Sequence, residues 1–307
     1  MSGPLPIAQR IHSDRRFASV FVTAPDGLRL HVRSYGSRVT SALPVVCLPG
    51  LARTAADFHP LATALAADPV NPRLVLALDY RGHGQSQYDR NPRNYAIRVA
   101  LADLSAVLAA FEITSAIFVG TSFGGVLAMM LAVLPPAAVA GVILNDIGPV
   151  MEPRGLIRIK SYVGKLPIAR NFEEGAEILR WLFEAQFTKL APQDWIAFAQ
   201  RTWREGHGTL VPSHDPKLAR ALRSYSLERL PTLWDQFDAL ARIPLMVIRG
   251  ANSDMLARPT LNEMLARRSQ LEVVVVPDQG HAPLLGEPKV IRRVAAFVAS
   301  CDAPARD

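Results

Sequence analysis

Residues 116–134 read AIFVGTSFGGVLAMMLAVL and decide the fold. Four apolar residues are followed by Ser122 between flanking glycines, and then by a run with helical periodicity. Strand, tight turn and helix in this order form a nucleophile elbow, which holds a serine hydroxyl above a sheet in strained backbone where neighbouring side chains would clash. Ser122 is therefore the candidate nucleophile. The competing interpretation is a glycine-rich turn that merely ends a strand.

Short apolar runs recur on both sides of this stretch, as expected for strands buried on both faces of a sheet. Helical stretches lie between them, so strand and helix alternate and the sheet is predicted to be mostly parallel. The first two runs are joined by Pro25, Asp26 and Gly27, which favours an antiparallel pair at the start. The eight predicted strands are 18–23, 28–35, 45–48, 74–78, 116–119, 142–144, 244–248 and 272–276. The predicted helices beside them are 55–66, 97–111, 123–134, 260–266 and 289–300.

Residues 148–241 lack such strand-like runs. Amphipathic stretches at 173–187 and 195–203 alternate there with loops rich in glycine and proline. We interpret this block as a helical insertion that lies over the sheet. The chain is then predicted to have a core domain of residues 1–147 and 242–307 and a helical cap domain of residues 148–241.

Two downstream residues complete a candidate catalytic set with Ser122. A serine hydroxyl is a poor nucleophile at neutral pH, so it needs a base in hydrogen-bond reach and an acid that orients that base. His281 follows the last predicted strand, and Asp254 follows the strand before it. Both emerge at the edge of a parallel sheet where ligands of open α/β sheets bind. The predicted triad is therefore Ser122, Asp254 and His281.

Two further motifs extend the pattern upstream. Residues 79–86 read DYRGHGQS after an early parallel strand, and residues 48–51 read LPGL. Together with the elbow and His281, in this order, they resemble the α/β-hydrolase fold family over nearly the whole chain, and the insertion resembles the family's helical cap. The resemblance implies an α/β-hydrolase fold with a mostly parallel, eight-stranded sheet and helices on both faces.

The resemblance also assigns further residues. It implies an oxyanion hole made by the backbone N–H groups of Leu51 and Phe123. Pro49 stands where the family usually has histidine, but the donor is a backbone group, so the hole is expected to survive. Some members place the triad acid after an earlier strand, which leaves Asp146 as the alternative acid. The other interpretation of Asp146 is a cap of the turn into the insertion.

The expected activity is that of a cofactor-independent serine hydrolase, a carboxylesterase that acts on a small ester or lactone through an acyl-enzyme on Ser122. Similar dehalogenases and epoxide hydrolases have aspartate at this position, which disfavours alkyl-enzyme chemistry. Carbon–carbon bond hydrolysis, enol-lactone hydrolysis and perhydrolysis use the same triad and remain alternatives. An alternative of another class is a receptor-like member that binds its ligand with negligible turnover.

Composition excludes several other functions. The chain has 307 residues and a net charge of +7, but only five of its 34 basic residues are lysine and the arginines are spread from end to end. No basic patch typical of nucleic-acid binding is therefore predicted. Cys47 and Cys301 lie too far apart for a metal cluster, and the glycine pair at 82 and 84 lacks the third glycine of a dinucleotide fingerprint. We expect no metal and no cofactor.

Location and partners follow from the same features. Residues 1–17 lack the continuous apolar stretch of a secretory signal, so a reducing cytoplasm is expected. The uncharged run 124–144 has the length of a membrane span, but Pro135 and Pro136 split it into halves too short to cross a bilayer. The expected partner is a small ester-like substrate, and we expect the protein to bind neither a membrane nor nucleic acid. It is expected to be a monomer or a homodimer.

Overall fold

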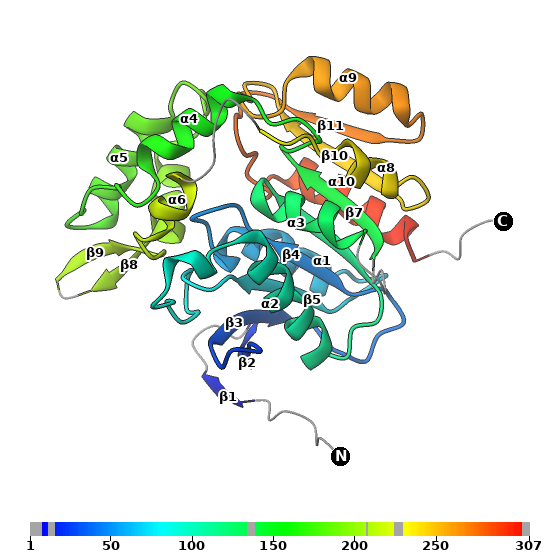
Figure 1. Cartoon of the computed structure of the whole chain (residues 1–307), viewed down its shortest axis with the longest axis horizontal. Coiled ribbons are helices and arrows are strands. Elements are labelled where there is room, and N and C mark those ends of the chain that lie inside the picture. Colours follow the sequence, from blue (N-terminus) through cyan, green and yellow to red (C-terminus); the bar gives the residue numbers. More distant parts are fainter. Residues whose placement is uncertain (1–7, 12–15, 134–138, 207, 224–229, 303–307) are drawn as a thin grey trace.

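The computed structural model describes residues 8–11, 16–133, 139–206, 208–223 and 230–302. Within these ranges the main sheet has nine strands in the order β1-β2-β3-β5-β4-β6-β7-β10-β11 (Figure 1). The strands are β1 (Ala8–Ile11), β2 (Ala18–Thr23), β3 (Arg29–Tyr35), β4 (Val45–Leu48), β5 (Val75–Asp79), β6 (Ala116–Thr121), β7 (Val139–Asn145), β10 (Leu245–Gly250) and β11 (Glu272–Val276).

All eight predicted strands are present, and β1 is an addition at the edge of the sheet. The first three pairings in the sheet are antiparallel: β1 with β2, β2 with β3, and β3 with β5. The remaining five pairings, which run in order through β5, β4, β6, β7, β10 and β11, are parallel. The predictions of a mostly parallel sheet and of an antiparallel start are therefore confirmed.

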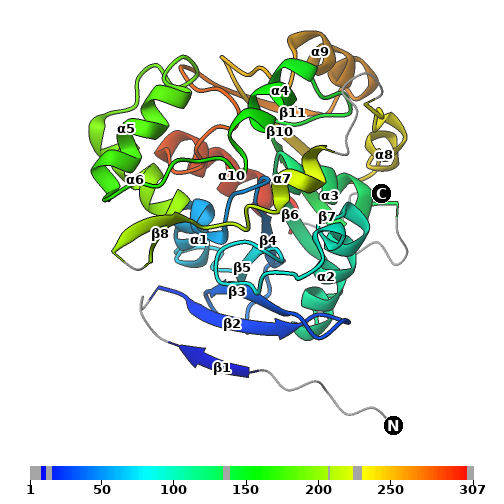
Figure 2. The ribbon, with the colours of Figure 1, turned by 60° about the vertical axis from the view of Figure 1, so that its left-hand side comes forward.

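Helices cover both faces of the sheet because its strands are apolar on both sides. In β4, Val45 and Cys47 join the apolar cluster of one face, and Val46 and Leu48 join that of the other. This alternation follows from the two-residue period of a strand. One face is covered by α1 (His59–Ala66) and α10 (Pro288–Ser300). The opposite face is covered by α2 (Ile97–Ala110), α3 (Phe123–Leu131), α8 (Trp234–Ala239) and α9 (Arg258–Arg267) (Figure 2).

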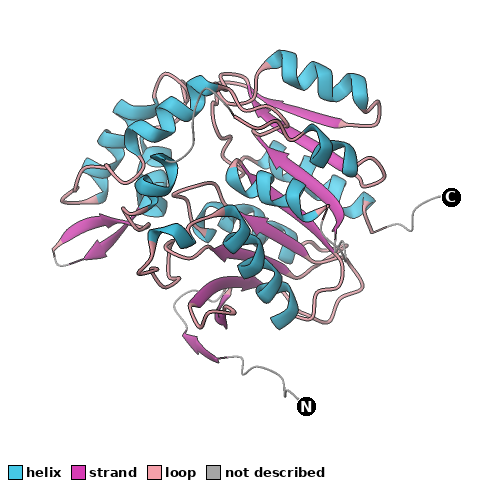
Figure 3. Cartoon of the chain, viewed as in Figure 1, coloured by secondary structure: helices cyan, strands magenta, loops and turns pink. Residues whose placement is uncertain are grey.

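The insertion between β7 and β10 is not wholly helical, and this part of the prediction is wrong. It contains α4 (Pro153–Tyr162), α5 (Phe172–Phe183), α6 (Pro192–Thr202), α7 (Leu218–Arg223) and α8, together with an antiparallel hairpin of β8 (Trp203–Gly206) and β9 (Thr209–Pro212) (Figure 3). The helical stretch expected to end at residue 203 ends one residue earlier. Their sequences, WREG and TLVP, are not continuous apolar runs like the VVCL of β4, which is equally short, so the apolar pattern could not reveal them.

The insertion packs in two ways. Helices α5 and α6 bury their apolar faces against each other in a cluster of their own, which includes Phe183, Phe198 and Trp203. Phe237 of α8 instead belongs to the apolar cluster on the sheet. The boundaries at residues 148 and 241 stay a prediction.

Pro135 and Pro136, which were expected to interrupt an apolar run, lie outside the described residues. No described helix is both long enough and apolar enough to cross a membrane. Cys47 and Cys301 are buried free thiols.

The elbow yields a test of the fold. A Cβ on Gly124 would lie 2.0 Å from the carbonyl oxygen of Leu48, a backbone atom that cannot turn aside. We expect Gly124→Ala to lower the free energy of unfolding by about 3 kcal/mol, as overpacking of a rigid site does. Denaturant titration followed by circular dichroism measures this.

Gly50→Ala is the matched control. The nearest atom to a Cβ on Gly50 is a side-chain carbon of Arg53 at 3.5 Å, an ordinary contact. Its free energy of unfolding should stay within about 0.5 kcal/mol of the unmodified protein. Unchanged stability of Gly124→Ala would contradict the packing described here.

Candidate active site

Ser122 occupies the turn between β6 and α3. Its backbone has φ +50° and ψ −113°, a conformation that costs a non-glycine residue about 1–3 kcal/mol. The turn can close because Gly120 and Gly124 have no side chains. A Cβ on Gly120 would lie 2.5 Å from backbone atoms of Gly124, so a larger residue does not fit at either position. The Ser122 N–H donates to the carbonyl of Asn145 at the end of β7 (3.0 Å). The strained serine turn inferred from the glycine pattern is thus present.

His281 lies in the loop after β11 and meets Ser122 across the sheet edge. Its Nε2 is 2.9 Å from the Ser122 Oγ, although the two residues are 159 positions apart in the chain. The backbone N–H of His281 donates to Oε1 of Gln186, just after α5 (3.1 Å). The insertion therefore helps to hold the loop that carries the imidazole.

The carboxylate that pairs with His281 is that of Asp146, the residue directly after β7. His281 Nδ1 lies 2.9 Å from Asp146 Oδ2. Asp146 is fully buried, and it also accepts the backbone N–H of Gly250 (2.8 Å) and the hydroxyl of Ser253 (2.6 Å). With a carboxylate as its partner, Nδ1 carries the proton, which leaves Nε2 as the acceptor that faces Ser122.

The prediction that Asp254 orients His281 is therefore wrong. Both carboxylate oxygens of Asp254 are bound by the guanidinium of Arg158 on α4, at 2.7 and 2.9 Å. Burial favours a raised pKa for Asp254, but the hydrogen bonds and charge of Arg158 outweigh it, so the pKa lies below its ordinary value. Asp254 thus ties the loop after β10 to the insertion.

The sequence held one signal that favoured Asp146. Asp146 follows its strand without a gap, and β7 lies beside β6, the strand of the nucleophile. Asp254 instead stands four positions beyond the end of β10, which lies one strand further from Ser122. The pairing with Arg158 was not predictable because the two residues are 96 positions apart.

Leu51 and Phe123 both present backbone N–H groups near Ser122. Phe123 is the first residue of α3, so its N–H has no partner within the helix. Among the described residues, neither N–H has a hydrogen-bond partner. The next N–H, that of Ala52, donates to Nε2 of His83 (3.2 Å), which holds the loop of Leu51 in place.

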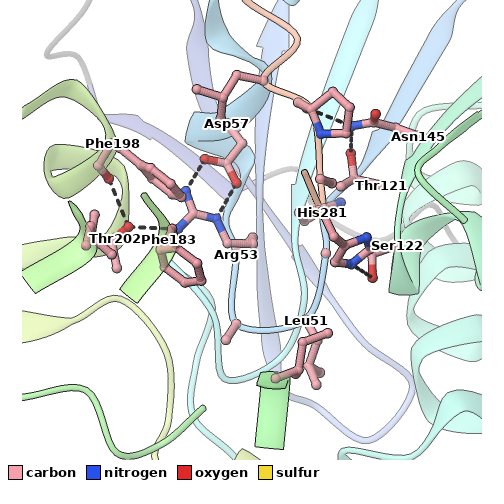
Figure 4. A pocket seen from close by; sticks show the side chains of 18 of the residues that line it. Leu51, Arg53, Asp57, Thr121, Ser122, Asn145, Phe183, Phe198, Thr202 and His281 are labelled. Atoms are coloured by element: carbon pink, nitrogen blue, oxygen red, sulfur yellow. Dashed lines mark hydrogen bonds and ion pairs between the residues drawn. The ribbon is translucent and has the colours of Figure 1, made fainter. Parts of the chain in front are cut away.

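Two cavities meet at Ser122. The first has a volume of about 950 Å³, its open mouth included, and extends between Ser122, His281 and the insertion. Figure 4 shows Arg53, Asp57 and Thr202 on the side of this cavity away from Ser122 and His281. The second, of about 840 Å³, is almost entirely apolar. Leu51, Ser122 and Ile159 line both cavities.

No three His, Cys, Asp or Glu side chains in the described part of the chain are grouped so that they could hold a metal ion. The buried His31, for example, contacts Asp79 (2.7 Å) and Ser19 (3.1 Å) through its two ring nitrogens. Both ring nitrogens are therefore occupied by hydrogen bonds that join β3 to β5 and to β2.

A mostly parallel sheet covered by helices, with a serine, a histidine and a carboxylate gathered at the carboxyl edge of its strands, defines the α/β-hydrolase class. Residues 45–294 match the model of the alpha/beta hydrolase family, and the chain belongs to this family. The fold inferred from the sequence motifs is thereby confirmed.

Individual relatives extend the match over nearly the whole chain. A 3-hydroxybutyrate-oligomer hydrolase of Cupriavidus necator is 33% identical over 92% of this chain and 97% of its own length. A crystal structure of an alpha/beta hydrolase from Novosphingobium aromaticivorans superimposes with a TM-score of 0.87 at 37% identity, covering 94% of this chain and 99% of that one. A 2-(acetamidomethylene)succinate hydrolase of Mesorhizobium japonicum is 25% identical over 83% of this chain and 85% of its own length.

The hydrogen bond of His281 can be tested without any substrate. A proton shared between an imidazole and a buried carboxylate gives a far-downfield proton resonance. We expect this signal to persist in Asp254→Asn and to disappear or move strongly upfield in Asp146→Asn, as measured by one-dimensional proton NMR. Loss of the signal in Asp254→Asn but not in Asp146→Asn would show that Asp254, and not Asp146, pairs with His281.

Proposed function

We propose that the protein is a cofactor-independent serine hydrolase that cleaves a small carboxylic ester through an acyl-enzyme on Ser122. The observation that carries this proposal is the unbroken hydrogen-bonded chain from Ser122 Oγ through His281 to the buried carboxylate of Asp146, with both links at 2.9 Å. Such a chain gives a serine hydroxyl the base that it needs to react at neutral pH.

In the first half of the reaction, Ser122 Oγ attacks the ester carbonyl and its proton passes to His281 Nε2. The carboxylate of Asp146 stabilises the imidazolium that forms, because the two groups are in contact and Asp146 is buried away from water. When the tetrahedral intermediate collapses, the carbon–oxygen bond to the alcohol breaks. His281 gives its proton to the departing alcohol oxygen, and the acyl group stays on Ser122.

The negative oxygen of the tetrahedral intermediate needs donors that are already in place. We assign this role to the backbone N–H groups of Leu51 and Phe123, which are without partners in the described part of the chain. One such donor is worth about 3 kcal/mol of transition-state stabilisation. The donors are backbone groups, so Pro49 in place of the family's usual histidine does not remove them.

In the second half, a water molecule attacks the acyl carbon while His281 takes its proton. The carboxylic acid leaves when the bond to Ser122 breaks, and the proton on His281 returns to the serine oxygen. The active site ends in its starting state, and no step requires a cofactor or an external reductant.

The relatives support ester hydrolysis. Hydroxybutyrate units joined through hydroxyl and carboxyl groups are linked by ester bonds, and the relative from Cupriavidus necator is a 3-hydroxybutyrate-oligomer hydrolase. A relative in Mycobacterium tuberculosis, 26% identical over 73% of this chain, is an esterase. A short oligoester of a hydroxy acid is therefore the first candidate for the natural substrate that should be assayed.

Removal of the nucleophile tests the proposal directly. We expect Ser122→Ala to lower kcat for p-nitrophenyl acetate by about 10³- to 10⁶-fold. A fluorophosphonate probe should attach one phosphonyl group per chain to the unmodified protein and none to Ser122→Ala, as intact-protein mass spectrometry measures. Turnover that survives in Ser122→Ala would refute the serine mechanism, and labelling without turnover of any ester would point to the receptor-like alternative.

The two aspartates should separate in activity. Asp146→Asn is expected to lower kcat by about 10⁴-fold, because the amide no longer holds the imidazole in the right tautomer or stabilises its charge. Asp254→Asn should lower kcat by no more than about tenfold, since Asp254 acts on the position of the insertion rather than on His281. Steady-state kinetics on one ester measures both, and equal losses would contradict the assignment of Asp146.

A further inference from the structure

Arg53 is the charged group at the far side of the first cavity. Its Nε and Nη2 donate to the two oxygens of Asp57 at 2.7 and 2.5 Å, and its Nη1 donates to the hydroxyl of Thr202 at 2.7 Å. The guanidinium also lies over the ring of Phe198, 4.6 Å from its centre. An arginine has five N–H bonds, so two of those of Arg53 remain without a partner among the described residues.

The local charge at this side of the cavity is not balanced. Arg201 also contacts Asp57, with its Nε 3.3 Å from Oδ1, so two guanidiniums share one carboxylate. Burial lowers the pKa of Arg201, and the neighbouring charge of Arg53 lowers it further, while the carboxylates of Asp57 and Asp194 oppose both effects. With both arginines protonated, Arg53, Arg201 and Asp57 together carry a net charge of +1, and an anionic group in the cavity would add a second carboxylate partner for Arg53.

His214 lines the same cavity and adds a donor without a partner. It is only 2% exposed, its Nε2 accepts the backbone N–H of Gly164 at 3.4 Å, and its Nδ1 has no hydrogen-bond partner among the described residues. Because Nε2 is an acceptor, Nδ1 carries the proton. Burial, with the charges of His83 and Arg53, lowers the pKa of His214 to about 3, so the ring stays neutral.

A buried donor without a partner is costly, and so is an uncompensated buried charge. Arg53 and His214 both line the first cavity, Arg53 with two N–H bonds that its contacts with Asp57 and Thr202 do not use and His214 with an unpartnered Nδ1. An acceptor group from a ligand in this cavity would supply what these donors lack. A carboxylate fits best, because it carries the opposite charge and offers two oxygens to a forked guanidinium.

We propose that Arg53 and His214 form a subsite for a carboxylate carried by the ester substrate, away from the bond that Ser122 attacks. Thr202 positions Arg53, because its hydroxyl accepts from the guanidinium while donating to the carbonyl of Phe198 (2.9 Å). The substrate class is then an ester in which one half also bears a free carboxylate. This inference rests on the proposed ester hydrolysis.

The second cavity takes the other half of such a substrate. It shares Leu51, Ser122 and Ile159 with the first cavity, and Phe123 and Val126 are among the apolar side chains that line it. A substrate that places its carboxylate against Arg53 and an apolar group against Phe123 brings its ester bond to Ser122.

Two matched pairs of esters test the subsite. In the first pair the acyl half carries the charge: p-nitrophenyl hydrogen adipate is compared with p-nitrophenyl adipamate, its neutral primary amide. In the second pair the alcohol half carries it: 4-acetoxybutyrate is compared with 4-acetoxybutanamide. For at least one pair, we expect kcat/KM of the carboxylate to exceed that of the amide by about tenfold or more.

The variants identify the residues. In Arg53→Gln and in His214→Phe, the ratio of the two kcat/KM values should fall toward one, mainly through a higher KM for the carboxylate. Arg53→Lys keeps the charge without the fork and should retain part of the preference. Arg180→Gln removes a positive charge from the exposed side of α5 and should leave the ratio unchanged.

A binding measurement separates this inference from the proposed mechanism. Adipate should bind to Ser122→Ala in isothermal titration calorimetry, more weakly as salt increases, and should not bind to the double variant that also carries Arg53→Gln. Equal kcat/KM values within both ester pairs, or an unchanged preference in Arg53→Gln and His214→Phe, would overturn the subsite. Failure of the hydrolase proposal would look different, because none of the four esters would then show turnover that depends on Ser122.

Discussion

The active site depends on a close approach of two backbone segments at the start of α3. The helix lies so near to β4 that a Cβ on Gly124 would stand 2.0 Å from the carbonyl oxygen of Leu48, and Gly120 allows the same chain to turn back on itself. Only glycine permits this approach. It brings the loop that begins at Pro49 against the turn of Ser122. The strained serine and the nearby N–H groups of Leu51 and Phe123, for which the described residues offer no partner, therefore depend on this backbone contact.

A second layer of polar contacts holds the loops around that turn. Asp79 at the end of β5 accepts the backbone N–H groups of Ala55 and Gln85 at 2.7 and 3.1 Å. Arg81 binds three carboxylates, those of Asp26, Asp89 and Asp103. These contacts join the turn between β2 and β3, the loop after β5 and helix α2.

His83 links this layer to both the active site and the insertion. Its Nδ1 donates to the carbonyl of Arg81 (2.9 Å), its Nε2 accepts the N–H of Ala52, and its backbone forms a β-bridge with His214. Burial lowers the pKa of His83, which keeps the ring neutral and its Nε2 free to accept. The proposed carboxylate subsite therefore adjoins the loop that carries the N–H of Leu51.

The sequence by itself determined eight of the nine described strands of the main sheet, the elbow and the pair of Ser122 and His281. Buried parallel strands are continuous apolar runs, and the turn of Ser122 depends on glycines that are its neighbours in the chain. The choice of acid was decided only by the tertiary structure. Asp146 follows β7 without a gap and Asp254 stands four positions beyond β10, which favours Asp146 without settling the choice. The choice is settled because Arg158, from a distant helix, binds Asp254 and His281 binds Asp146. The hairpin of β8 and β9 was likewise decided in three dimensions, because these strands, unlike the equally short β4, are not apolar runs buried in the sheet.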